Sequence, residues 1–74
     1  MILSSAKSGV NVKLVAISAD RSSISKLSFM GLIQGAEFTI IRNDQEGPVI
    51  VAIKNSRFVL GRGLACKIEV ELLP

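Results

Sequence analysis

Two spacings of apolar residues alternate along the chain and predict its elements. A spacing of two, typical of a strand with one buried face, is clearest over residues 67–72, where every second residue is Ile, Val or Leu. A spacing of three places Ile24, Leu27 and Met30 on one face of a helix. Runs rich in Gly, Asn, Asp and Ser separate such segments and are typical of turns. The pattern therefore predicts several short strands and one short helix.

Five segments fit strands, and each is bounded by residues that favour turns. They are 12–17, 36–42, 49–53, 57–60 and 67–72. The third is apolar throughout, so both of its faces are expected to be at least partly covered. Residues 54–56 form a tight connection, so the third and fourth strands should pair as a hairpin. A single helical turn is expected over 64–66.

Alternation also predicts which strand residues share a face. In the first strand these are Val12, Leu14 and Ala16. In the last strand the buried face is expected to hold Ile68, Val70 and Leu72, and its wet face Glu69 and Glu71.

The stretch from Leu27 to Gly35 joins the end of the helix to the next strand. Polar residues 20–25 precede it and include several types that cap helices. Gly31 can adopt the left-handed backbone conformation that ends a helix, which a Cβ atom penalises. Gly35 allows a second sharp turn. We therefore predict that Gly31 and Gly35 are structural turn positions.

Five short strands and one helix in 74 residues indicate a mainly β fold with a small, strongly bent sheet. Closure of the sheet into a small barrel would remove its exposed edges. The length predicts a single domain over residues 1–74. A chain of this size buries only about 60% of its unfolded surface, so the core is expected to be marginal.

Composition suggests apolar surface without a membrane segment. Hydrophobic residues make up 49% of the chain and the mean hydropathy is +0.49, which is high for a small soluble domain. The longest apolar run, 49–53, is far shorter than the roughly 20 residues of a membrane helix. We therefore expect a cytoplasmic domain, not inserted in the membrane, with part of its apolar excess exposed as a partner site.

Charge and aromatic content argue against nucleic-acid binding. The net charge is +3, and the basic residues are spread from Lys7 to Lys67 without forming a run. Three Phe are the only aromatic residues, whereas single-strand binding requires aromatic platforms in a basic groove.

The residues for common catalytic and metal sites are missing. The chain has no histidine, and its single cysteine, Cys66, is expected to be a small buried apolar residue. Gly61 and Gly63 lack the Lys and Ser or Thr that complete a phosphate-binding loop. Carboxylate pairs could hold a hard cation only weakly. We expect no enzyme, no catalytic residue, no cofactor and no metal site in one copy.

The apolar residues near the helix end are the candidate contact site. Phe29 lies off the face formed by Ile24, Leu27 and Met30, and Ile33 follows the helix end. We expect the partner contact to be made by Phe29, Met30, Leu32 and Ile33. The alternative is that these side chains form a satellite cluster closing one end of a barrel.

The same stretch resembles the "L..MGL.PG" signature of the FeoA family, through Leu27, Met30, Gly31, Leu32 and Gly35. Leu3-Ser4 with Gly9, and the segments 48–51, 58–60 and 65–70, are similar to the opening and ending of that family. Gln34 and Ser8 stand where the family often has Pro, which removes some turn rigidity.

The resemblance implies an SH3-like β-barrel with a helix inserted after the first strand. It implies a cytoplasmic accessory of ferrous iron uptake that acts on the G domain of FeoB, the membrane transporter. The same fold occurs in the C-terminal domain of DtxR-like repressors. The alternative function is therefore a transition-metal-binding or metal-sensing module, as a homo-oligomer whose copies pool Cys66 and carboxylates.

Overall fold

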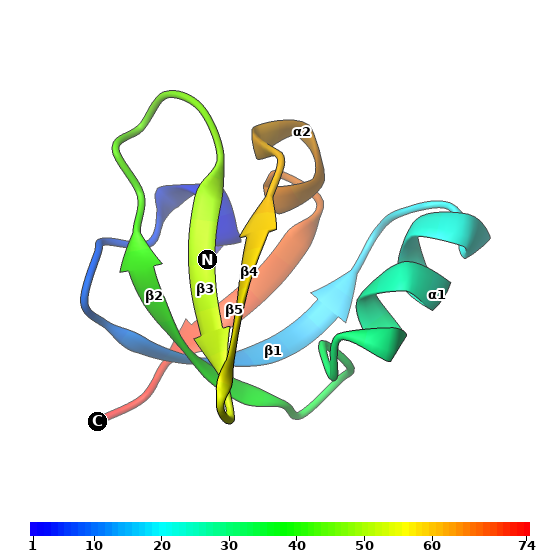
Figure 1. Cartoon of the computed structure of the whole chain (residues 1–74), viewed down its shortest axis with the longest axis horizontal. Coiled ribbons are helices and arrows are strands. Elements are labelled where there is room, and N and C mark those ends of the chain that lie inside the picture. Colours follow the sequence, from blue (N-terminus) through cyan, green and yellow to red (C-terminus); the bar gives the residue numbers. More distant parts are fainter.

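The computed structural model describes all residues, 1–74, and is dominated by one antiparallel sheet with a helix at its side (Figure 1). The elements in order are η1 (Leu3–Ser5), β1 (Asn11–Ile17), α1 (Arg21–Phe29), β2 (Glu37–Arg42), β3 (Val49–Ile53), β4 (Ser56–Leu60), α2 (Arg62–Ala65) and β5 (Ile68–Leu72). The mainly β class and the helix after the first strand are confirmed. Neither α1 nor α2 has the length and apolarity needed to cross a membrane.

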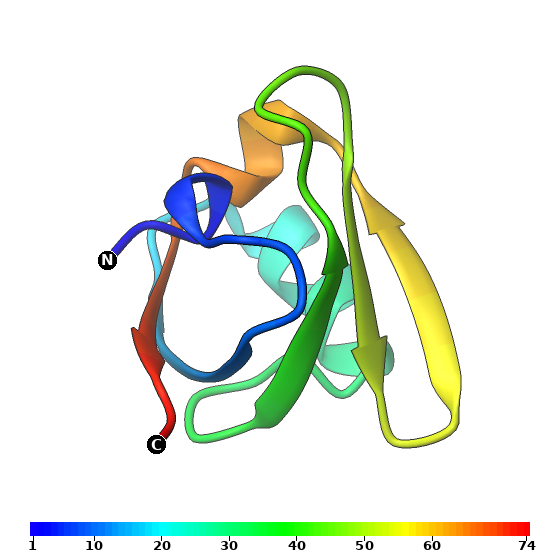
Figure 2. The same cartoon turned by 90° about the vertical axis from the view of Figure 1, so that its left-hand side faces the viewer.

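The sheet has the strand order β4-β3-β2-β1-β5, with every pair antiparallel. The predicted hairpin of β3 and β4 is confirmed, since Ile53 pairs with Ser56 across a two-residue loop. Strand β5 returns from α2 to lie beside β1. The bent sheet is SH3-like, and its two end strands are seen at opposite margins in Figure 2.

The expected closure into a barrel is wrong, because β4 and β5 do not pair. The N-terminal residues occupy the outer edge of β5 instead. Ile2 forms a β-bridge with Glu69. The backbone N–H of Val70 donates to the Met1 carbonyl at 2.7 Å, and the Met1 amino group donates to the Val70 carbonyl at 3.0 Å. With this edge filled, β4 has no strand to close against.

The core consists of 15 buried residues, all of them apolar. It takes side chains from every strand and from η1, α1 and α2. The predicted alternation fails at two places. Ala16 is exposed because the register of β1 against β5 shifts between Leu14 and Ala16, and such a bulge turns the following side chain outward. Leu72 is exposed because β5 ends there, at the margin of the sheet.

Helix α1 packs on the sheet through few side chains. Leu27 is its only buried residue, Met30 is half-buried just after the helix, and Ile24 is exposed, so the predicted apolar face is only partly used. Asp20 is the N-cap residue, and its Oδ1 accepts a 2.6 Å hydrogen bond from the Ser23 hydroxyl. The helix therefore lies at the side of the sheet (Figure 1), and most of its residues are exposed.

The C-terminus of α1 closes as a Schellman motif. Gly31 has a φ of +88°, and its N–H donates to the Ser28 carbonyl at 2.9 Å. The N–H of Leu32 donates to the Leu27 carbonyl at 2.9 Å. Leu27 and Leu32 are both buried, as expected for the apolar pair that accompanies this motif. Gly35 also has a φ of +88°, so both predicted turn glycines are confirmed.

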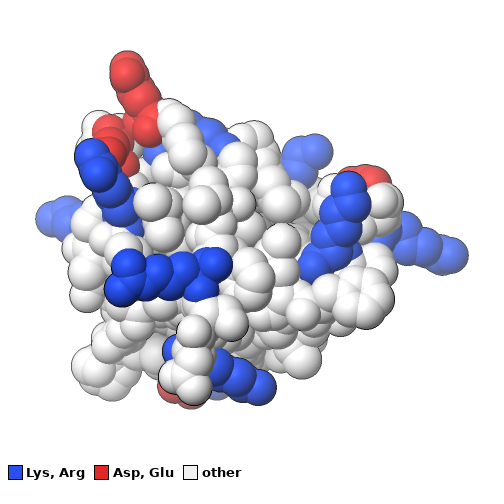
Figure 3. All heavy atoms as spheres, viewed as in Figure 1, with Lys and Arg blue, Asp and Glu red and all other residues white.

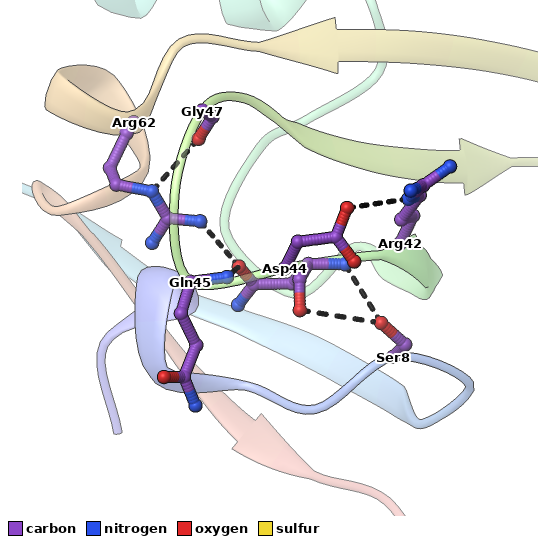
Figure 4. Close-up of polar contacts among 7 residues, drawn as sticks. Ser8, Arg42, Asp44, Gln45, Gly47 and Arg62 are labelled. Atoms are coloured by element: carbon purple, nitrogen blue, oxygen red, sulfur yellow. Dashed lines mark hydrogen bonds and ion pairs between the residues drawn. The ribbon is translucent and has the colours of Figure 1, made fainter.

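Asn43 and Arg62 tie three segments together at the end of the sheet opposite the β3–β4 loop (Figure 4). The Asn43 side-chain amide donates to the Ser4 and Ala6 carbonyls at 2.8 and 2.7 Å. The Arg62 guanidinium donates to the Gly47 carbonyl at 2.8 Å, to the Ser4 carbonyl at 3.3 Å and to the Asn43 side-chain oxygen. These bonds join η1, the β2–β3 loop and α2.

Candidate partner-binding surface

The predicted contact residues separate into surface and core positions. Phe29 is 91% exposed and Ile33 is 52% exposed, whereas Met30 is half-buried. Leu32 is 1% exposed, so most of its side chain lies in the core and it meets the surface only as one of the residues that line a groove. Its side chain is held in the core because Leu32 supplies the apolar half of the Schellman motif. The exposed members stand on the end of α1 and on the turn that follows it.

A groove runs beside this helix end, between α1 and β1. It has a volume of about 370 Å³, and seven of its nine lining residues are apolar. Ile24 and Ser28 contribute from α1, and Ile33 contributes from the turn after the helix. The remaining lining residues are Leu14, Val15, Ala16, Ile17, Leu32 and Gln34. We call Ile24, Phe29, Ile33 and this groove the helix-end surface.

Sequence reasoning missed the contribution of β1 to this surface. Val15 and Ile17 lie on the strand face opposite Val12 and Leu14, and both are half-buried. The sequence did contain a signal for this contribution, because β1 has apolar residues on both faces. A strand with one face in solvent has polar residues on that face. Helix α1 covers part of this second face, and the groove is the part left open.

The charged residues of α1 are mostly basic. Arg21 and Lys26 lie on the helix, and Asp20 at its N-cap is the nearest acidic residue in the sequence. The Ser23 hydroxyl bonded to Asp20 lowers the pKa of that carboxyl, and the charge of Lys67 lowers it further. Both charged residues of α1 are therefore basic, while Glu37 and Glu71 line hollows that share Ile33, Leu14, Val15 and Gln34 with the helix-end surface.

Cys66 is exposed, so the prediction that it is a buried apolar residue is wrong. It is the C-cap residue of α2, where the side chain points away from the core occupied by Ala65. Its Sγ lies 3.4 Å from the Ser4 Oγ. Cys, Asp and Glu side chains nowhere gather in a group of three or more. One copy thus lacks the ligand cluster of an ordinary protein metal site.

These features define a small SH3-like β domain with an apolar surface at the end of its helix. The FeoA domain model matches residues 1–72, and the chain belongs to the FeoA family.

A curated relative from Methanocaldococcus jannaschii, named Fe(2+) transport protein A, is 44% identical over 69 residues, which cover 93% of this chain and 83% of the relative. A crystal structure of the iron uptake regulatory protein FeoA superposes with a TM-score of 0.90 at 32% identity, covering 99% of this chain and 97% of that one. The IdeR structure from T. acidophilum superposes with a TM-score of 0.86 at 19% identity, over 97% of this chain and 33% of that one. This last likeness shows the fold alone.

Proposed function

We propose that this chain is a non-enzymatic accessory of ferrous iron uptake in the cytoplasm, which binds the G domain of a FeoB-type membrane transporter. Membership of the FeoA family and the name of the relative from Methanocaldococcus jannaschii support the link to iron transport. The observation that carries the binding role is the exposure of Phe29 on the helix-end surface.

An exposed Phe beside an apolar groove suits a protein contact. Burial of a Phe side chain contributes about 1.5–3 kcal/mol, and aromatic residues are frequent among the few that dominate an interface. The groove of about 370 Å³ has room for apolar side chains of the partner. In this arrangement Phe29 enters the partner while the partner fills the groove, so both proteins bury apolar surface.

The test is a titration of the isotope-labelled chain with the soluble G domain, with and without guanine nucleotide, followed by amide NMR shifts. We expect shifts at Ile24, Ser28, Phe29 and Ile33. Shifts confined to residues outside the helix-end surface would contradict the site. An absence of shifts in every nucleotide state would contradict the G domain as partner.

A metal-binding or metal-sensing homo-oligomer is the second candidate. The observation in its favour is the exposure of Cys66, since an exposed thiol is accessible to a second copy. Two or more copies would have to pool Cys66 and carboxylates, because one copy does not assemble three such ligands. Stoichiometric binding of Fe²⁺ at micromolar affinity, lost in Cys66→Ser, would favour this function. Weak binding that survives the substitution would contradict it.

A further inference from the structure

The outer edge of β4 is the one sheet edge that the fold leaves open. Strand β4 is hydrogen-bonded to β3 alone, and no turn, loop or side chain bonds to its other side. The β5 edge, by contrast, is covered by Met1 and Ile2. Figure 2 shows β4 at the outer margin of the sheet, with no element beyond it.

The register identifies the backbone groups that are free. Ile53 and Ser56 flank a two-residue loop, so they form a hydrogen-bonded pair. Hydrogen-bonded and non-hydrogen-bonded pairs alternate along an antiparallel ladder. The N–H and C=O groups of Arg57 and Val59 therefore point away from β3, toward the open edge.

This edge lacks the features that usually prevent pairing with another strand. Its pairing with β3 is regular, with no bulge, and it contains no Pro. The sequence Arg-Phe-Val-Leu favours extended structure. Val59 is 64% exposed, and Arg57 is the single charge on the strand. Short length and one arginine are the only protection that remains.

The charge near the open edge of β4 indicates which kind of segment could bind there. From Pro48 to Ile68 the chain carries no acidic residue, and the basic residues Lys54 and Arg57 lie on the β3–β4 hairpin. Glu37 of β2 is an acidic residue that shares a hollow with Lys54. Figure 3 looks onto the β3–β4 hairpin and shows Lys and Arg side chains over the middle of this face, with acidic side chains only toward its margins. Pairing of two β4 strands would put both Arg57 side chains into one short interface in which neither β4 strand supplies an acidic residue, so charge does not favour self-association.

We propose that the open edge of β4 binds an extended, acidic segment of a partner protein by strand addition. The backbone of the segment would bond to Arg57 and Val59, its acidic side chains would face Arg57 and Lys54, and an apolar side chain would cover Val59. Main-chain bonds supply affinity in this mode, and the side chains supply selectivity.

This inference stands on β4 alone and does not depend on the helix-end surface. The two surfaces meet at the β3–β4 loop, because Lys54 lines the same hollow as Ile33. One partner could therefore contact both, with an extended segment on β4 and a folded part on the helix end.

The test uses two capped six-residue peptides as probes, one alternating Glu with Val and one alternating Lys with Val. Each is added in excess to the labelled chain, and amide hydrogen exchange is followed by NMR. We expect the Glu peptide to slow exchange at the Arg57 and Val59 amides by about tenfold or more, since these groups gain partners. The Lys peptide should have a much smaller effect.

Val59→Pro removes the outward N–H without breaking a bond to β3, and Pro is tolerated at such an edge position. We expect it to weaken Glu-peptide binding by about tenfold or more, whereas Val59→Thr, which keeps the N–H, should bind as the native chain does. If Val59→Pro does not fold, Arg57→Glu tests the proposal instead. We expect Arg57→Glu to bind the Lys peptide more tightly than the Glu peptide, because the charge facing the peptide is reversed.

Three results would overturn the proposal. One is the absence of protection at Arg57 and Val59 with either peptide. Another is equal binding by folded Val59→Pro and Val59→Thr, which would mean that the peptide contacts side chains only. The third is protection that grows with chain concentration in the absence of peptide, which would make a second copy the occupant.

Discussion

Single residues decide how the helix ends and what it leaves exposed. Gly31 ends α1 with a positive φ, and a Cβ added there would lie 3.5 Å from the Ile53 side chain, an ordinary contact distance. The requirement for glycine is therefore a property of the backbone and not of space. The same turn buries Leu32, so Phe29 and Ile33 are the large apolar residues that remain exposed at the helix end.

Substitution of Gly31 tests this conclusion. We expect Gly31→Ala to lower the free energy of unfolding by about 1 kcal/mol or more, because an L residue is strained in the left-handed region. Chemical denaturation measures the change. Gly63→Ala is the matched control, since Gly63 lies in α2 without a positive φ and with open space around it, and it should be neutral or stabilising. Equal effects at both sites would show that the φ of Gly31 is not limiting.

Phe29 is the residue on which partner binding is expected to depend. Phe29→Ala should weaken binding to the FeoB-type G domain by about tenfold or more while leaving stability unchanged, because the side chain is exposed in the free chain. Isothermal titration measures the affinity. Leu72→Ala removes another exposed apolar side chain, on β5 and outside both proposed contact surfaces, and should leave that affinity unaltered.

Ile33→Asp should likewise abolish binding to the G domain while the fold stays intact, because it places a charge within the apolar contact. Native affinity in both Phe29→Ala and Ile33→Asp would exclude the helix-end surface as the docking site.

At the scale of elements, α1 depends on its ends more than on its packing. One buried side chain anchors the helix, and the Schellman motif closes its C-terminus. At its N-terminus the Asp20 carboxylate accepts a bond from Ser23, and this lowers the pKa of the carboxyl. An anionic group is also favoured near the positive end of the helix dipole.

The lowered pKa predicts how the stability of α1 depends on pH. A carboxyl with a depressed pKa in the folded state stabilises the fold above its unfolded pKa of about 3.9, and the stabilisation is lost as the pH falls through the folded value. The stability difference between the native chain and Asp20→Asn should therefore be present at neutral pH and shrink below about pH 4. Urea denaturation at several pH values measures it. A difference independent of pH would show that the Asp20 charge has no role.

At the scale of the whole molecule, the Asn43 and Arg62 network holds the N-terminal segment in place. That segment covers the β5 edge, so the network indirectly keeps the sheet open with β4 as its only free edge. No barrel of hydrogen bonds closes around the core, and side-chain bonds to carbonyls join the segments instead.

Removal of Asn43 should therefore destabilise the whole fold. Asn43→Ala loses two donated bonds and leaves the Ser4 and Ala6 carbonyls without this partner. We expect a loss of about 1–3 kcal/mol, since a net hydrogen bond contributes about 0.5–1.5 kcal/mol. Thermal unfolding measures the loss, with Ser5→Ala, an exposed residue of η1, as the control. A shift no larger than that of the control would show that other contacts hold the segment.

Local patterns along the sequence determined the elements of this protein. Each strand lies within one residue of its predicted bounds, because burial alternates with a period that adjacent residues already display. The turn glycines and the exposed Phe29 and Ile33 followed from the same local reasoning. The conformational limits on a glycine and the position of a helix end act within a few residues.

Only the tertiary structure decided which surfaces are free. Pairing of Met1 and Ile2 with β5 excludes closure by β4, and this competition joins residues nearly seventy positions apart. The burial of Leu32, the exposure of Cys66 and the groove along β1 likewise depend on which distant segments pack on which face. The spacing of apolar residues in the sequence indicates which face of a helix or strand is buried. Which other segment covers that face is decided by packing and hydrogen bonding across the whole chain.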